Sequence, residues 1–198
     1  MRIAPSLFLF FGAAALSLAA STVNVNFDEY TSPPVTCCYS DTGVTGPLVY
    51  PDVTVQDGIG SGYVMNGSGW NNVQTSGDNL FGTESGSIDL IFNSGVSNFS
   101  VDVINGSGAA GFALNLYDAA HSLIATSAFN LTDWGSVGSV LTVNPGTSGI
   151  WYAEIIGDSD FAIDTVSFDT GSSPIPEPST ILLMAGGVCA LLLKRLRA

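Results

Sequence analysis

The chain has few side chains suited to catalysis. It contains one histidine, His121, and no serine or cysteine is spaced to act with it as an activated nucleophile. His121 falls in Tyr117–Ile124, where a short polar turn separates two strand patterns, and His tolerates the left-handed backbone of such turns. We interpret His121 as a turn residue and not as a catalytic base.

Paired carboxylates could supply the acid and the base that cleave a glycosidic bond. Asp158 and Asp160 are close in sequence, but Gly157–Asp160 lies between two strand patterns and is typical of a tight turn. No carboxylate pair has the spacing of a known catalytic motif. The sequence favours a noncatalytic protein, and an exported hydrolase stays as a third class.

Exposed aromatic rings could instead bind a sugar by stacking on its apolar face. Trp70 and Trp134 lie in polar, glycine-containing loop sequences, and we predict that they contact ligand. The alternative is that each ring folds back to cap the core. Trp151 lies within a strand pattern and is expected in the core.

The elements that must position these residues are β-strands. No window has a sustained helical period, whereas several alternate between apolar and polar residues and are separated by Gly, Asn, Asp and Pro. The alternating windows are 23–27, 88–92, 99–103, 112–116, 123–129, 137–143, 150–156 and 161–168. They predict at least eight short strands in an all-β, antiparallel, jelly-roll-like β-sandwich. The stretch 30–79 is less regular and is expected to carry long loops.

Two short segments at the ends of this domain resemble carbohydrate-binding jelly rolls: Asn26-Phe-Asp-Glu29 and Phe161-Ala-Ile-Asp-Thr-Val-Ser-Phe168. In those modules similar segments meet on neighbouring terminal strands, often around a structural calcium ion. The resemblance implies a partial ligand set of Asp28, Glu29 and Asp164, because calcium prefers several oxygen ligands. The family pattern often has Asp-Asp where this chain has Asp164-Thr165. The alternative is that Asp164 hydrogen-bonds neighbouring loop amides.

The charge of the domain is entirely acidic. All four Lys and Arg lie outside 21–173, whereas 16 of the 17 carboxylates lie inside it, the exception being Glu177. Such a surface repels nucleic acid and anionic membranes unless cations bridge the contact, so nucleic acid is not expected as a partner. Divalent cations are plausible partners, and solubility is the alternative explanation.

Cys37 and Cys38 are adjacent in the chain. In an oxidising compartment they could form a strained vicinal disulfide or bridge two chains. A zinc site is not expected, because 21–173 has no further Cys and only one His.

The N-terminus has the pattern of a secretory signal peptide, residues 1–20. Arg2 precedes an apolar stretch, and small residues follow near Ala19 and Ala20. The predicted domain therefore begins at about residue 21 and is exported.

The C-terminus, 174–198, combines a Pro-Glu-Pro triplet, a short apolar run and a basic end. It resembles the PEP-CTERM sorting signal of Gram-negative envelope proteins. The matching residues are Pro176, Glu177, Pro178, Lys194, Arg195 and Arg197. The resemblance implies that an exosortase-type membrane protease recognises the segment and cuts near the triplet, in bacteria that secrete exopolysaccharide. A transmembrane helix is expected at about 179–193, short for a bilayer and with its basic end cytoplasmic. A permanent tail anchor is the alternative.

Together these patterns predict a signal peptide (1–20), a β-sandwich (21–173) and a sorting signal (174–198). The expected function is noncatalytic association with polysaccharide in the cell envelope or extracellular matrix, after a transient stay in the inner membrane. The alternative is a structural or adhesive surface protein that binds other proteins, or itself through calcium bridges.

Overall fold

The computed structural model describes residues 20–34, 43–70, 75–83, 85–139, 149–157 and 160–171, all within the compact unit Ala20–Gly171. In these residues the chain is an all-β, antiparallel structure with one short 3-10 helix, η1 (Gly67–Trp70). The predicted sorting signal and transmembrane segment, and the predicted signal peptide except Ala20, lie outside the described residues. None of the helices within the described ranges has the length and apolar character needed to span a membrane.

The strands match the windows of alternation. They are β1 (Ser21–Val25), β2 (Leu48–Val49), β3 (Val53–Asp57), β4 (Tyr63–Asn66), β5 (Asn79–Thr83), β6 (Ser87–Asn105), β7 (Ala110–Tyr117), β8 (Leu123–Leu131), β9 (Val137–Ser139), β10 (Ile150–Gly157) and β11 (Phe161–Thr170). Each predicted window overlaps one of them. The windows 88–92 and 99–103, expected as separate strands, join in the single long strand β6.

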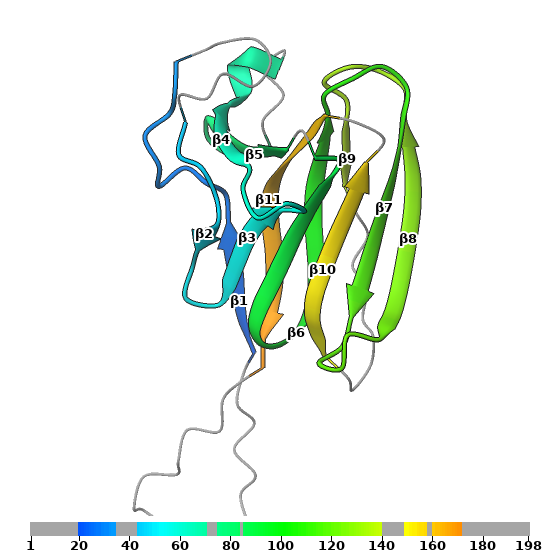
Figure 1. Cartoon of the computed structure of the whole chain (residues 1–198). Helices are drawn as coiled ribbons and strands as arrows, with labels where there is room; N and C mark the ends of the chain where they lie inside the picture. The colour runs from blue at the N-terminus through cyan, green and yellow to red at the C-terminus, as the bar shows by residue number, and fades with distance from the viewer. Residues whose placement is uncertain are drawn as a thin grey trace, which may run out of the picture. The chain divides into compact units, whose positions relative to one another are not determined.

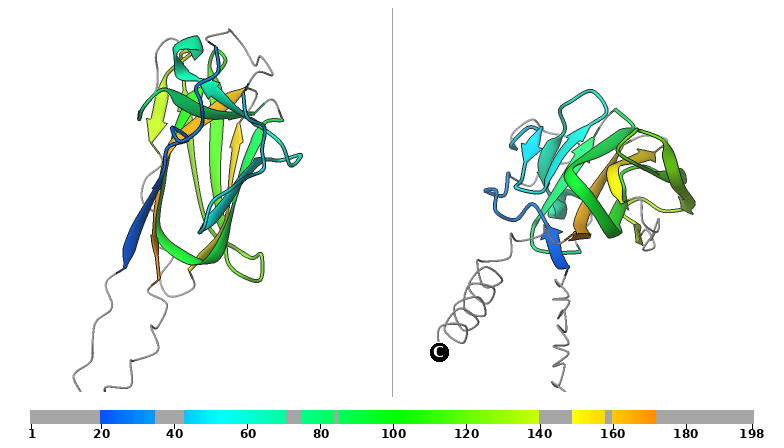
Figure 2. Two further views of the ribbon diagram at one scale, coloured as in Figure 1. Left: turned by 90° about the vertical axis from the view of Figure 1, so that its left-hand side faces the viewer. Right: turned by 90° about the horizontal axis from the view of Figure 1, so that it is seen from below.

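The long strand β6 takes part in two layers. Its first part pairs with β3 on one side and β10 on the other, and β7 and β8 continue this first layer. Its second part pairs with β11 and β9, and β11 also pairs with β5 and β1 in the second layer. Between the two parts β6 bends from one layer to the other (Figures 1 and 2). This arrangement is consistent with the predicted β-sandwich.

The core lies between the two layers and contains the inward residue of each alternating pair. The first layer contributes Val55, Leu90 and Leu114, and the second contributes Val101 and Phe168, all in one buried cluster. Successive side chains of a strand point to opposite faces, so the residues between them face outward. The faces that the apolar alternation predicted are confirmed in 88–92, 99–103 and 112–116, whereas Leu123 and Val137, the first residues of two further windows, are exposed.

The stretch 30–79, expected to carry long loops, also contains short strands. It contains β2, β3 and β4, and β3 completes the first layer by pairing with β6. Val53 and Val55 are fully buried there. The alternation in β3 covers only five residues, so it gave a weak signal amid the surrounding turn residues.

Candidate functional site

The outward side of the first layer carries a polar row that crosses five strands; we call this side the outer face. Strand register places Glu154 opposite Asp89 on one neighbour and opposite Asn115 on the other. Asp89 in turn lies opposite Gln56, and Asn115 lies opposite Thr126. Directly opposed side chains of antiparallel strands are close enough to interact, so the five residues form one continuous row.

Hydrogen bonds hold this row in place. Tyr117 Oη donates to Glu154 Oε2 at 2.9 Å, and Asn115 Nδ2 donates to the same oxygen at 3.3 Å. Thr126 Oγ1 donates to Asn115 Oδ1 at 2.9 Å. On the other side of Glu154, Asp89 is hydrogen-bonded by the side chain of Tyr152. The two carboxylates are thus preorganised, each with a tyrosine beside it.

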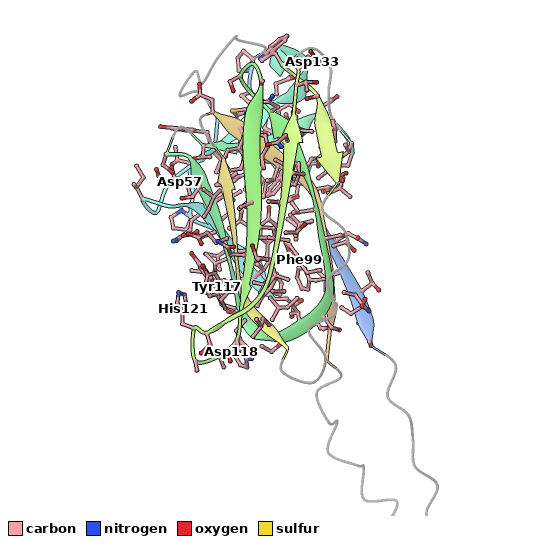
Figure 3. The ribbon with its side chains drawn as sticks, turned by 90° about the vertical axis from the view of Figure 1, so that its right-hand side faces the viewer. Asp57, Phe99, Tyr117, Asp118, His121 and Asp133 are labelled. Atoms are coloured by element: carbon pink, nitrogen blue, oxygen red, sulfur yellow. The ribbon has the colours of Figure 1, made fainter. Side chains whose placement is uncertain are left out.

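Three aromatic rings flank the row at one end of the outer face. The rings of Tyr117 and His121 are stacked, with centroids 4.9 Å apart and an interplanar angle of 13°. Tyr152 packs against both, with its ring centroid 5.4 Å from that of Tyr117 and 4.9 Å from that of His121. Figure 3 shows Tyr117 and His121 near the margin of the molecule, away from Phe99 in the interior. We call these three residues the aromatic cluster.

The hairpin turn between β7 and β8 brings His121 into this cluster. His121 has φ 59°, the left-handed conformation expected for it, and its N–H donates to the carbonyl of Asp118. Asp118 Oδ1 accepts from the backbone N–H groups of Ala120 and Ser122, each at 2.9 Å. The sequence predicted the turn, but not that the imidazole would stack on Tyr117.

Burial raises the pKa of Asp89 in the row and of the two tyrosines beside it. Desolvation raises the pKa of Asp89, and the hydrogen bond from Tyr152 opposes this rise. The pKa of Tyr152 is raised by burial and then by its hydrogen bond to Asp89, and that of Tyr117 by desolvation and its hydrogen bond to Glu154. Both tyrosines therefore stay protonated near neutral pH and donate to the carboxylates.

A shallow open depression of about 320 Å³ continues the outer face beyond the polar row. It is lined by residues of three of the five strands of the row, β7, β8 and β10: the small residues Gly111, Ala113, Ala128 and Gly157, together with Phe112, Phe129, Asn130 and Ile156. Ile156 lies opposite Ala113, which lies opposite Ala128. The outer face thus combines rings, carboxylates and amides with a neighbouring apolar depression, a combination suited to noncovalent binding of a polar ligand that has apolar faces.

The residues predicted to bind calcium take another arrangement. Buried Asp164 accepts hydrogen bonds from the backbone N–H groups of Thr75 and Ser76 at 2.8 and 2.7 Å, and from their hydroxyls. Asp28 Oδ1 accepts from the N–H groups of Asp78 and Asn79 at 2.9 and 3.1 Å. The two end segments of the domain therefore meet on one segment, residues 75–79, and hold it through its amides.

Glu29 is exposed and does not complete a cation site with these residues. Over the described ranges, no group of three or more His, Cys, Asp or Glu side chains is arranged to hold a metal ion. The alternative role for Asp164, hydrogen bonding to loop amides, is the one this geometry displays. Calcium binding stays a prediction.

The tryptophans occupy different settings. Trp134, in the turn before β9, is 45% exposed, as expected for a loop ring. Trp70 ends η1, and its side chain lies outside the described residues. The expectation for Trp151 was wrong, because its side chain is 37% exposed. A register shift between Ile150 and Tyr152 turns Trp151 out of the core, against Gly95 in the bend of β6.

Several predictions concern residues outside the described ranges. The sorting residues Pro176, Glu177, Pro178, Lys194, Arg195 and Arg197 are among them, as are Cys37, Cys38 and Asp158. Sequence analysis missed the polar row and both tyrosines of the aromatic cluster. The available signal was the polar half of each alternation, Asn115 and Tyr117 in β7 and Tyr152 and Glu154 in β10, but its assembly depends on strand register.

Comparison with protein-family models and with curated protein sequences gives no match. Solved structures with a weak match to this chain include a DUF4465 family protein from Bacteroides caccae, which is 12% identical with a TM-score of 0.49 and covers 75% of this chain and 98% of that one. TmCBM61, solved with β-1,4-galactotriose, is 13% identical with a TM-score of 0.33, covering 61% of this chain and 85% of that one. The C-terminal CBM6 of LamC, a marine laminarinase from Zobellia galactanivorans, is 15% identical with a TM-score of 0.29 and covers 76% of this chain and all of that one.

These similarities are weak and concern the all-β fold alone. Fold does not by itself imply function, so the functional argument has to come from the site.

Proposed function

We propose that this protein is a noncatalytic, polysaccharide-associated β-sandwich of jelly-roll type, and that it contacts glycan through the outer face. The observation that carries the proposal is the polar row of Asp89, Glu154 and Asn115 beside the aromatic cluster. Sugars present hydroxyls to polar side chains and apolar faces to aromatic rings, and preorganised partners reduce the entropic cost of binding.

The proposed location is the cell envelope, cell surface or extracellular matrix of a Gram-negative bacterium. Support comes from the signal-like residues 1–20 and the PEP-CTERM-like residues 174–198. The proposed partners are an exosortase-type membrane protease, the inner membrane during sorting and an exopolysaccharide. Mass spectrometry of the mature protein from cells tests this route. Ends near Ser21 and near Pro176 would support it, and an intact residue 198 in the mature protein would contradict it.

Binding of the full chain to the exopolysaccharide of the source organism tests the glycan role. The purified protein is titrated in a detergent that contains no sugar, with calcium present and with a chelator. Saturable binding supports the proposal, and its loss with chelator would also support the structural calcium ion. Absence of binding in both conditions would contradict the proposal.

Two variants distinguish the outer face from the end loops. We expect Tyr152→Ala to weaken binding about tenfold, the equivalent of about 1.4 kcal/mol, because it removes a ring and the hydrogen-bond partner of Asp89. Trp134→Ala tests the loop tryptophan predicted to contact ligand. Figure 3 shows the adjacent Asp133 at the opposite end of the domain from His121. Loss of binding in the Trp134 variant alone would place the contact at the end loops instead.

The alternative function is a structural or adhesive surface protein acting through protein contacts or calcium-bridged self-contacts. The observation that favours it is the density of carboxylates without Lys or Arg in 21–173. Analytical ultracentrifugation checks it. Self-association that rises with calcium and is indifferent to added glycan would favour this function over polysaccharide association.

A further inference from the structure

We propose that the outer face binds a glycan carrying free amines, an amino-sugar polymer whose ammonium groups are held between Asp89 and Glu154 beside the tyrosine rings. This inference rests on the proposed function, because it assigns a ligand class to the same face. Four features support it: the placement of the two carboxylates, the lack of Lys and Arg in 21–173, the rings and the depression.

The two carboxylates lie side by side on the outer face. Asp89 and Glu154 are directly opposed on neighbouring antiparallel strands, and both are half-buried. The hydrogen bonds from Tyr117 and Asn115 both end on Oε2 of Glu154. A carboxylate has about four lone-pair sites, so Glu154 keeps acceptor capacity for an ammonium donor.

Residues 21–173 supply no Lys or Arg to neutralise this pair. The nearby His121 is exposed in the hairpin turn. The two half-buried carboxylates lie close enough to repel each other. A positively charged ligand relieves this repulsion and therefore binds favourably. An acidic polysaccharide would add like charge and meet repulsion.

The rings distinguish an amino sugar from a simple cation. Tyrosine faces attract ammonium groups and also stack on the apolar faces of sugar rings. The ring centroids of Tyr117 and Tyr152 are 5.4 Å apart, and each tyrosine donates a hydrogen bond to one of the two carboxylates. A ligand with both an amine and an apolar ring face matches this pairing.

The depression indicates a ligand longer than one sugar. Along β10 the outward positions run from Tyr152 through Glu154 to Ile156, four residues or about 13 Å. At the far end, Ala113 and Ala128 leave the open space beside Ile156. A chain of linked sugars can place one unit at the rings and carboxylates and the next in the depression.

Titration of the full chain with three β-1,4-linked tetramers tests the inference. The tetramers, of glucose, N-acetylglucosamine and glucosamine, share a backbone and differ at the C2 substituent, and binding is measured below the pKa of the sugar amine. We expect the glucosamine tetramer to bind at least tenfold more tightly than the others. Glu154→Gln should reduce this binding to the level of the glucose tetramer, because it removes one charge and preserves side-chain shape.

The control variant is Asp133→Asn, which removes the same charge from an exposed turn at the other end of the domain (Figure 3). Tetralysine is the control ligand that has charge without sugar rings. Equal binding of tetralysine, or equal loss in both variants, would overturn the inference in favour of nonspecific charge attraction. Circular dichroism verifies folding, and Asp89→Asn replaces Glu154→Gln if the latter does not fold.

The remaining outcomes separate the two proposals. Equal or tighter binding of a neutral tetramer would overturn the amine preference and leave the glycan role intact. Binding of the exopolysaccharide without binding of any tetramer would overturn the amine preference as well. If neither the exopolysaccharide nor any tetramer binds, both proposals fail.

Discussion

The buried Asp164 side chain accepts five hydrogen bonds, from Thr75, Ser76 and the N–H of Thr165. Asp164→Ala would leave these donors without their acceptor, and we expect the free energy of unfolding to fall by about 3 kcal/mol or more. Urea denaturation measures the change. The control is Asp133→Asn in an exposed turn, where we expect only a small shift of the midpoint. Equal effects of the two substitutions would contradict this role.

The raised pKa of Asp89 predicts how the stability of the protein depends on pH. Because its pKa is raised in the folded state, the folded protein binds more protons than the unfolded chain between the two pKa values. Its contribution to stability is therefore most favourable at low pH and is lost as pH rises through the folded pKa. We expect Asp89→Asn to flatten this part of the pH dependence, measured by urea denaturation from acid to neutral pH. An unchanged slope would contradict the raised pKa.

The segment 75–79 connects the two ends of the domain, because its N–H groups donate hydrogen bonds to Asp28 and to Asp164. Gly77 has φ 22°, and a Cβ there would overlap the Asp28 carboxylate that binds this segment. We expect Gly77→Ala to cost about 1–3 kcal/mol of stability, because Asp28 must move away from the amides it accepts from. Gly108→Ala is the control, since no atom lies within 4 Å of its Cβ position. Thermal unfolding of both variants measures the loss of stability, and equal melting temperatures would contradict the role of residues 75–79 in holding the two ends of the domain.

Residues 21–173 carry 16 carboxylates and no Lys or Arg. Repulsion between these like charges lowers the stability of the folded domain as a whole. We expect the melting temperature to rise as sodium chloride screens these charges. A further rise with calcium at the same ionic strength would indicate a specific site, because screening alone is then constant. A melting temperature that calcium leaves unchanged would contradict the predicted structural calcium ion.

Local sequence predicts most of the strands and the buried faces of those in the core. Phe112, Leu114 and Leu116 face the core as their alternation predicts, because side-chain direction in a strand has a period of two and is a local property. The acidic charge follows from composition, and the left-handed turn at His121 was predicted from the residues around it. The chemistry of the chain ends is predicted by sequence alone, and it lies outside the described residues.

The candidate site, in contrast, depends on how the strands pair in the folded domain. Gln56, Asp89 and Glu154 are far apart in the chain and meet through strand register, which no local pattern fixes. The same reason explains why β6 joins two predicted strands and why a register shift exposes Trp151. A local pattern specifies which face of a strand is buried, whereas the polar row depends on which strands lie side by side, and that is settled by packing of the whole core.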